Sequence, residues 1–506
     1  MNKITSTLAE LAEKAGDNYR QIADVKADGK EENLRRAIDG YERALRFFTL
    51  PNYRLRHANL QNNLGITYCR LGEVRDKERN FGLGIKAYQD ALPVYTFQAY
   101  PHDYAVIQNN LGNAFGTLAE VRDKEANLGL AIKAYQDALR VYTLNSFPEN
   151  YAATQNNLGN AYRHVAEVRD KEANLGLAIN AFEEALRVYV VDAYPEKYAH
   201  TKNNLGNAYG NLAQVRDKEP NLDRALKCFT EALRWRTLEA FPQYYAGTQN
   251  NLGNVYSSLA EIRDKATNLG LSIIAFKEAL RIRTPEAFPQ GYAMAQYNLA
   301  TAYCKLAELR DKEANLDLSI QADREALRVS TFEAFPQDYA MIQVGLGNAY
   351  GSLAEARDKE VNLGLSVQAF EEALRIQTFE AFPQDYAVIQ NNLGNAYFRL
   401  AEVREKEPSL NLALKALRNA LRVFTFEALP EYYAGAHFNL ARTCSALAVT
   451  LLEGGATDGA KDLLRAAQAS CAEALRVYTK ESYPEHYESL NKLITWLDAQ
   501  LAKVQS

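Results

Sequence analysis

The feature that most constrains this chain is a repeat of fixed length. A leucine inside a recurring QNNLGNAY-type stretch stands every 47 residues without insertion or deletion, at Leu64, Leu111, Leu158, Leu205, Leu252, Leu299, Leu346, Leu393 and Leu440. A fixed period of this size is the signature of stacked units, each of which packs against its neighbours. The sequence therefore predicts one continuous repeat array over residues 1–506 rather than several unrelated domains.

Each unit contains two helical patterns. In the copy that begins at Pro101, apolar residues recur at steps of three or four as far as Leu118, which is typical of one face of a helix. Proline suits the first turn of such a helix, where its missing N–H is not needed. The charged run RDKE follows at 122–125, and a second apolar stripe extends from Leu128 to Tyr142. Each unit is thus predicted to be a long helix, a charged turn, a second helix and a loop closed by proline.

The two ends of the chain depart from this pattern. Residues 33–49 are predicted to form a second helix and residues 3–26 its first, so residues 1–50 form a divergent N-terminal capping repeat. Residues 51–429 contain eight regular 47-residue repeats, and residues 430–506 contain an altered last repeat and a capping helix at roughly 485–501. Atypical ends are expected because terminal repeats must cover an apolar face that no neighbour covers. We expect ten helix pairs and one capping helix.

Small and aromatic residues recur at fixed places in both helices. In one copy these are Leu111, Gly112 and Phe115 in the first helix and Ala131, Tyr135 and Ala138 in the second. This pattern resembles the tetratricopeptide repeat (TPR) over almost the whole chain, although the unit is longer than the common 34 residues. The resemblance implies an all-α fold, a right-handed α-solenoid (superhelix) of about ten helix pairs plus a C-terminal capping helix. Glycine and alanine would let the two helices of a pair approach, and the aromatic ring would fill the gap between them.

Long TPR units of this kind are similar to arrays of bacteria and archaea that often accompany CHAT caspase-like peptidase domains. The chain has no βαβ pattern and no His/Cys pair in a suitable context for such a domain. By resemblance, it is the recognition or scaffold partner of a separately encoded effector.

Asparagine is the polar residue that recurs most conspicuously, although in a helix it costs up to ~0.7 kcal/mol relative to alanine. One column directly precedes the anchor leucine, at Asn63, Asn110, Asn157, Asn204, Asn251, Asn298, Asn392 and Asn439, with Gly345 in the remaining copy. A second column stands two residues after the leucine, at Asn113, Asn160, Asn207, Asn254, Asn348 and Asn395. A third stands one residue before the first, at Asn62, Asn109, Asn156, Asn203, Asn250 and Asn391.

The first two columns are the candidate partner-binding residues. In TPR solenoids the first helices line a concave groove, so the resemblance implies that these amides point into the groove and form a ladder from unit to unit. An amide offers both a donor and an acceptor, which suits the backbone of an extended peptide. The TPR arrays of O-linked N-acetylglucosamine transferase and of kinesin light chain look like relatives that use groove asparagines in this way.

The alternative is that these amides satisfy polar groups between adjacent helices with no ligand involved. Two successive asparagines point about 100° apart and cannot both face the centre of one groove. Positions that differ among copies have the same two interpretations, specificity or drift on a solvated surface: Arg163, His164, Tyr297, Lys305, Val344, Phe398 and Arg399. The RDKE run predicts ion pairs between units on an exposed rim.

Composition and charge limit the function further. A net charge of −5 and a pI near 5.9 argue against a non-specific binder of nucleic acid or of an anionic membrane. The five cysteines lack CxxC spacing, which favours a reducing, cytoplasmic location over a disulfide framework or a zinc site. No catalytic constellation, cofactor motif or metal motif is present, and no apolar stretch approaches the ~20 residues of a membrane span.

The sequence therefore predicts a non-enzymatic scaffold that binds an extended peptide or protein segment in an Asn-lined groove. The second hypothesis is a structural or self-assembling protein whose asparagines only brace the solenoid. Self-association is not favoured, and neither nucleic acid nor membrane is an expected partner.

Overall fold

The computed structural model describes residues 2–25, 28–49 and 51–505. Within these residues the chain forms twenty-one α-helices and no β-strand. It falls into two compact units, residues 1–251 and 252–506, with the boundary inside α11. The predicted all-α fold is confirmed, and each unit is described here by itself.

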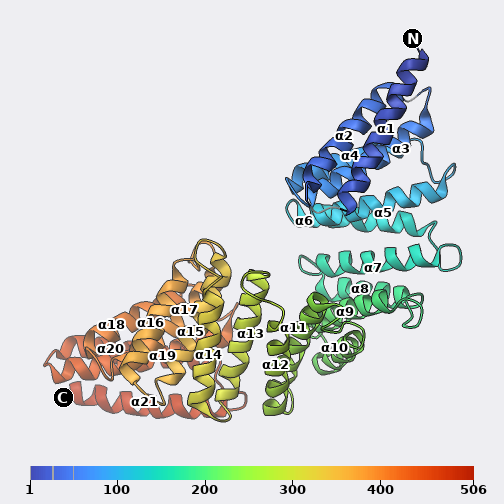
Figure 1. The fold of residues 1–506 in the computed structure, drawn as a ribbon. Coiled ribbons are helices and arrows are strands. Elements are labelled where there is room, and N and C mark those ends of the chain that lie inside the picture. The colour runs from blue at the N-terminus through green and yellow to red at the C-terminus, as the bar shows by residue number, and fades with distance from the viewer. Residues whose placement is uncertain (1, 26–27, 50, 506) are drawn as a thin grey trace. The chain divides into compact units, whose positions relative to one another are not determined.

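The helices follow one another as antiparallel pairs, a longer first helix and a second helix (Figure 1). The first ten are α1(Asn2–Val25), α2(Lys30–Phe47), α3(Arg54–Gly72), α4(Lys77–Ala91), α5(Pro101–Leu118), α6(Lys124–Leu139), α7(Pro148–Val165), α8(Lys171–Leu186), α9(Pro195–Leu212) and α10(Lys218–Leu233). The others are α11(Pro242–Leu259), α12(Lys265–Leu280), α13(Pro289–Ala307), α14(Lys312–Leu327), α15(Pro336–Leu353), α16(Lys359–Leu374), α17(Pro383–Leu400), α18(Lys406–Ala420), α19(Pro430–Glu453), α20(Thr457–Leu475) and α21(Pro484–Gln505).

The described helices match the predicted ten pairs and one capping helix. The predicted end of the first helix at residue 26 and the predicted boundary at residue 50 lie outside the described residues. The capping helix α21 is longer at its C-terminal end than the predicted 485–501. Its residues Leu490, Leu497 and Leu501 are buried against α20, and Trp496 packs on the same cluster. The last helix thus covers the apolar face that the final pair would otherwise expose.

Helix starts have two recurring local causes. Proline begins the first helices from α5 to α19, and the residue before it is extended, as at Tyr100 with φ −140°. The second helices of the regular units begin after a residue in the left-handed conformation, with φ between 44° and 47° at seven aspartates and 35° at Glu405. Aspartate is among the non-glycine residues that adopt this conformation most readily. The RDKE run therefore encodes a sharp turn as well as a charged surface.

An asparagine in the first turn closes this turn in seven of the regular second helices, α4 to α16, and Ser409 takes its place in α18. The side-chain amide of Asn127 donates to the carbonyl oxygen of Arg122 at 2.7 Å, and that of Asn221 to Arg216 at 2.8 Å. The same bond is made by Asn80, Asn174, Asn268, Asn315 and Asn362. These amides satisfy a carbonyl that the turn leaves open, so this set of asparagines is structural.

The two helices of a regular pair meet at a glycine. A Cβ atom on Gly206 would lie 2.7 Å from the ring of Phe229, and one on Gly112 would lie 2.5 Å from the ring of Tyr135. The same close approach joins Gly65 to Tyr88, Gly159 to Phe182, Gly253 to Phe276 and Gly347 to Phe370. The predicted role of glycine in letting the helices approach is confirmed.

The pair α13 and α14 is an exception. Ala300 takes the place of the glycine and Asp323 the place of the aromatic residue. The side chain of Asp323 is 1% exposed, its Oδ1 has no hydrogen-bond partner among the described residues, and burial raises the pKa of its carboxyl well above the usual value. A Cβ atom on Gly345 would lie 3.1 Å from Asp323 Oδ2 and 3.4 Å from the ring of Tyr297. Gly345 therefore makes room for the two larger side chains, which gives a packing reason for the variation at 297 and 345.

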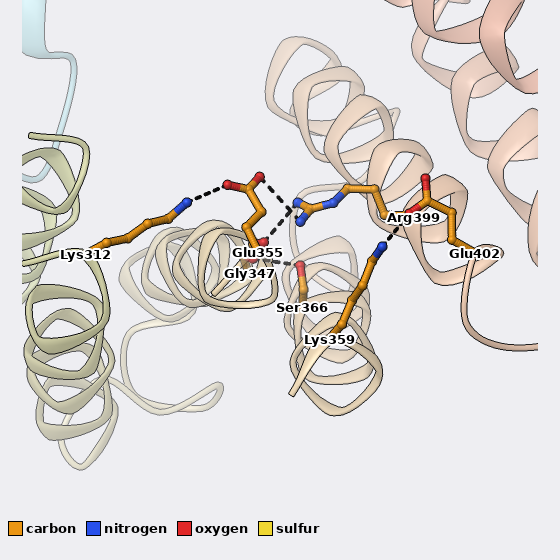
Figure 2. Close-up of polar contacts among 8 residues, drawn as sticks. Lys312, Gly347, Glu355, Lys359, Ser366, Arg399 and Glu402 are labelled. Atoms are coloured by element: carbon orange, nitrogen blue, oxygen red, sulfur yellow. Dashed lines mark hydrogen bonds and ion pairs between the residues drawn. The ribbon is translucent and has the colours of Figure 1, made fainter. Parts of the chain in front are cut away.

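Exposed ion pairs join consecutive repeats, as the charged runs predict. Lys124, at the start of α6, contacts the Glu167 carboxylate at 2.7 Å, and Lys312, at the start of α14, contacts Glu355 at 2.6 Å. Figure 2 shows the second of these pairs together with the equivalent pair Lys359–Glu402 in the next repeat. Pairs this exposed each contribute less than ~1 kcal/mol.

Candidate functional site

The fourteen asparagines of the first two columns all lie on first helices. They are Asn63 on α3, Asn110 and Asn113 on α5, Asn157 and Asn160 on α7, Asn204 and Asn207 on α9, Asn251 and Asn254 on α11, Asn298 on α13, Asn348 on α15, Asn392 and Asn395 on α17, and Asn439 on α19. The side chains of Asn113, Asn254 and Asn348 are exposed, and the others are half-buried. We call these fourteen residues the asparagine face.

Amide-to-amide hydrogen bonds link consecutive first helices. Asn157 Nδ2 on α7 donates to Asn113 Oδ1 on α5 at 3.0 Å, and Asn392 Nδ2 on α17 donates to Asn348 Oδ1 on α15 at 3.3 Å. In both bonds the donor is the asparagine before the anchor leucine, and the acceptor is the one after the leucine of the preceding unit. The two columns are thus brought together where consecutive repeats pack against each other.

In other repeats the donor is again the asparagine directly before the anchor leucine, but the acceptor is an asparagine of the third column. Asn204 Nδ2 donates to Asn156 Oδ1 at 3.3 Å, and Asn251 Nδ2 donates to Asn203 Oδ1 at 3.5 Å. The equivalent bond from Asn439 to Asn391 is 3.1 Å long. Each donor uses one N–H in this way, and its own Oδ1 accepts no hydrogen bond from the described residues. The bridging asparagines brace the array and still offer an acceptor.

Asn63 and Asn113 on the asparagine face also accept hydrogen bonds from larger side chains. Arg20 Nη1 donates to Asn63 Oδ1 at 3.0 Å, and Tyr135 Oη donates to Asn113 Oδ1 at 2.7 Å. Burial raises the pKa of Tyr135, so its phenol stays protonated and remains a donor. Asn113 Oδ1 therefore accepts two hydrogen bonds and is fully used inside the protein.

The remaining members have no side-chain hydrogen bond to any described residue: Asn110, Asn160, Asn207, Asn254, Asn298 and Asn395. Their position in helix interiors lowers helix stability relative to alanine. Since none of them braces a neighbouring unit, bracing accounts for only part of the asparagine face. These six amides have both donors and acceptor available to a partner.

In the second compact unit, residues 252–506, the asparagine face borders a pocket of about 410 Å³. Its lining includes Asn348, Asn392, Asn395 and Arg399. Arg399 Nη1 donates to the Gly351 carbonyl oxygen at 2.9 Å, and its Nη2 lies 3.4 Å from the Glu355 carboxylate (Figure 2). Arg399, one of the positions that differ among copies, is thus held by the preceding repeat at the wall of this pocket.

The thiols are unsuited to nucleophilic chemistry. Burial raises the pKa of Cys228, Cys304, Cys444 and Cys471 to about 11 and that of Cys69 to about 12. A thiol is a nucleophile as the thiolate, which these cysteines do not form near neutral pH. In the part of the chain that the structure describes, no three His, Cys, Asp or Glu side chains are grouped to hold a metal ion. None of the described helices has the length and apolar character needed to cross a membrane.

Two residues beside the asparagine face are not marked by the helix pattern. Trp235 and Arg236 follow α10, where the preceding units have Val-Tyr, at 141–142 and 188–189. They line a pocket with Asn156 and Asn157. The signal in the sequence is a cation at a position that is aromatic in the preceding copies, and it becomes visible only when the 47-residue repeats are aligned.

Stacked helix pairs, most of them closed by a glycine against an aromatic ring, fit a TPR-like array. No model of a known protein family matches the chain, and a search of curated proteins also gave no match. Among solved structures, the C-terminal part of a TPR repeat-containing protein from Cytophaga hutchinsonii is similar over 61% of this chain and 94% of its own, with 13% identity and a TM-score of 0.36. An IFIT1 monomeric mutant with Gppp-AAAA is similar over 87% of this chain and 90% of its own, with 13% identity and a TM-score of 0.38.

Proposed function

We propose that this protein is a non-enzymatic interaction scaffold that binds an extended segment of a partner protein along the asparagine face. The observation that carries this proposal is the set of six asparagines without an internal hydrogen bond. An extended peptide has unpaired backbone N–H and C=O groups, and each free amide can pair with one of each. The bridging asparagines add carbonyl oxygens at intervals set by the repeat.

We propose further that this protein is a recognition or regulatory subunit of a larger assembly, whose effector is encoded on a separate chain. This part of the proposal rests on the resemblance to prokaryotic TPR arrays. It is consistent with the thiol pKa values, which give the chain no cysteine nucleophile of its own near neutral pH.

The second candidate function is a structural or self-assembling role, and the amide-to-amide bonds favour it. Asn157, Asn204 and Asn251 each donate to the preceding first helix, which is what bracing requires. On this alternative the asparagines contribute to stability and contact no partner.

Two matched triple variants separate the two functions. Asn110, Asn160 and Asn207 have no side-chain bond to any described residue, whereas Asn157, Asn204 and Asn251 are the bridging set. A peptide is first selected from a displayed library on the wild-type protein, and its affinity is then measured for both alanine triples. The proposal predicts that alanine at 110, 160 and 207 weakens binding at least tenfold with no loss of melting temperature, because alanine is the better helix former.

Alanine at 157, 204 and 251 is expected to lower the melting temperature. If the triple at 110, 160 and 207 binds the selected peptide as tightly as the wild type does, the asparagine face is not the binding surface. Sedimentation of the wild type then tests self-assembly, because a concentration-dependent increase in mass supports that role and a monodisperse monomer opposes it.

A further inference from the structure

One repeat of the first unit buries an arginine where the two preceding repeats bury a tyrosine; the following repeat has Arg283 at the same position, and that side chain is only half-buried. Tyr142 and Tyr189 are 2% and 4% exposed, and Arg236, at the equivalent position, is 6% exposed. Arginine is rarely buried so completely unless a carboxylate pairs with it. Arg236 therefore needs an explanation that the repeat pattern does not supply.

The partners of Arg236 are neutral. Its Nη1 donates to Thr248 Oγ1 at 3.0 Å, its Nη2 donates to His200 Nδ1 at 3.1 Å, and its guanidinium carbon lies 4.9 Å from the centre of the Tyr244 ring. Burial and the Arg236 charge lower the pKa of His200, which keeps the imidazole neutral and able to accept at Nδ1. No carboxylate among the described residues lies within ion-pair distance of Arg236. A guanidinium has five N–H donors, so three of them remain unused.

Arg236 forms part of the wall of a pocket of about 270 Å³ in the first unit, between α7, α9 and the segment after α10. Its apolar walls include Trp235, Phe241 and Tyr244, and its polar lining includes Asn157 and Thr201. Thr201 is 1% exposed, and its hydroxyl has no hydrogen-bond partner among the described residues. The pocket thus combines an arginine that forms no ion pair, an unpartnered hydroxyl and aromatic surface.

The charges around the pocket limit the ligand to a single negative charge. Lys197, which also lines it, forms an ion pair with Glu149, and Glu196 stands beside Lys197. Arg236 forms no ion pair with a described carboxylate, although Glu196, which lines the same pocket, attracts its charge, and that carboxylate opposes a dianion such as a phosphate monoester. A carboxylate is planar and accepts two parallel N–H bonds from a guanidinium.

We propose that this pocket binds a carboxylate side chain of the partner peptide together with an adjacent aromatic side chain, with Arg236 and Thr201 as the carboxylate donors and Trp235 as the stacking surface. This inference rests on the proposed peptide-binding function. Asn157 belongs both to the pocket and to the asparagine face, so a peptide on that face can extend one acidic residue into the pocket.

The second unit has a pocket of about 350 Å³ at the same place in its repeats, which serves as an internal comparison. There Gln377 replaces Arg236, Met341 replaces His200, and Asp338 and Asp385 replace Lys197 and Tyr244. The same cavity without the cation, and with two acidic side chains, is unsuited to a carboxylate. Arg236→Gln places in the first pocket the residue type that the second pocket already has at the equivalent position.

The test uses the full chain with Trp496→Phe, so that Trp235 is the remaining tryptophan of the two. The probes are a blocked Asp-Phe dipeptide, its Asn-Phe counterpart, phenylacetate and inorganic phosphate, each titrated against Trp235 fluorescence. We expect the Asp-Phe probe to bind at least tenfold more tightly than the Asn-Phe probe and more tightly than phenylacetate. If phenylacetate binds more tightly than the Asp-Phe probe, the ligand is not a peptide side chain. If phosphate binds more tightly than the Asp-Phe probe, the pocket does not select a carboxylate.

Two variants separate binding from folding. Arg236→Gln is expected to weaken the Asp-Phe probe at least tenfold, and Thr201→Val to weaken it severalfold, with no loss of melting temperature in either. If Arg236→Gln lowers the melting temperature and leaves probe affinity unchanged, the arginine is structural and the inference is wrong. The alanine triple at 110, 160 and 207 should still bind the Asp-Phe probe. The peptide-binding assay therefore tests the asparagine face, and the probe titration tests the pocket independently.

Discussion

The close approach of two helices at Gly206 leads to a prediction that a single pair of variants can test. Gly206 and Gly210 lie one turn apart on α9. A Cβ atom on Gly206 would lie 2.7, 2.9 and 3.0 Å from three ring atoms of Phe229, whereas one on Gly210 would have no heavy atom within 4 Å apart from its chain neighbours and the nearby backbone of its own helix. Gly206→Ala and Gly210→Ala therefore make the same chemical change in one helix, with and without a steric neighbour.

The expected magnitudes follow from these distances. Carbon atoms in contact prefer a separation of about 3.5 Å or more, so α9 and α10 must move apart by roughly 0.5–1 Å, or Phe229 must shift. Phe229 is 1% exposed and has little room to move. Overpacking of this kind costs about 1–3 kcal/mol, and the better helix propensity of alanine returns up to about 1 kcal/mol. We expect Gly206→Ala to destabilise the protein by about 1–2 kcal/mol and Gly210→Ala to stabilise it by about 0.5–1 kcal/mol.

Urea unfolding followed by the fluorescence of Trp235 is the appropriate assay. Trp235 follows α10 by two residues, so in a Trp496→Phe background it reports on the helix pair that carries the substitution. A local probe is needed because the units of a repeat array are coupled to their nearest neighbours and need not unfold together. The unfolding free energy is read from the midpoint at constant slope.

The steric explanation also predicts that Gly206→Ala and Phe229→Ala together cost less than the sum of the two single changes, because removal of the ring removes the clash. Equal shifts of Gly206→Ala and Gly210→Ala in the same direction would refute the packing argument. Additive costs in the double variant would show that the added methyl group meets no resistance from the ring.

Three further predictions concern other groups. In thermal melts, Asp323→Asn should match the wild type in stability near pH 4 and exceed it increasingly as pH rises. Burial raises the pKa of Asp323 in the folded protein, so the wild-type protein loses stability as the pH rises above the pKa of the unfolded chain. Parallel pH profiles of the two proteins would contradict this. Asn221→Ala should cost about 1–2 kcal/mol in chemical unfolding, since the buried amide satisfies the Arg216 carbonyl, and a neutral effect would show that water replaces it. Lys124→Gln should change stability by less than ~1 kcal/mol, because its pair with Glu167 is exposed, and a larger, salt-sensitive loss would mean that the rim charges act as a network.

The repeat period and the helical stripes were sufficient to predict the helix pairs, and the reason is local. Period, proline position and apolar spacing are properties of a chain segment, and each regular unit meets the same neighbours as the next. The Gly–aromatic contact was predictable for the same reason, since a residue type that recurs at a fixed offset indicates a recurring contact. The capping helix followed from the apolar face that the last pair would expose.

The roles of individual asparagines were decided only by the tertiary structure. Asn157 and Asn160 lie on the same helix and occupy equally regular columns, yet Asn157 donates to Asn113 on α5 and Asn160 has no bonded neighbour among the described residues. Sequence spacing fixes which face of a helix a side chain occupies, but a hydrogen bond depends on the distance to the next helix and on the rotamers on both sides.

Substitutions within single repeats show the same limit. Asp323 and Arg236 depart from a position that is aromatic in the repeats before them, and in the sequence they look like the drift expected of any repeat. Their consequences come from burial, which leaves one carboxyl oxygen without a hydrogen-bond partner and one guanidinium without an ion pair among the described residues. The sequence by itself thus determined the architecture of this protein, because architecture depends on patterns that repeat. Tertiary structure alone decided where polar groups remain unsatisfied, because that depends on what each side chain meets in the neighbouring helix.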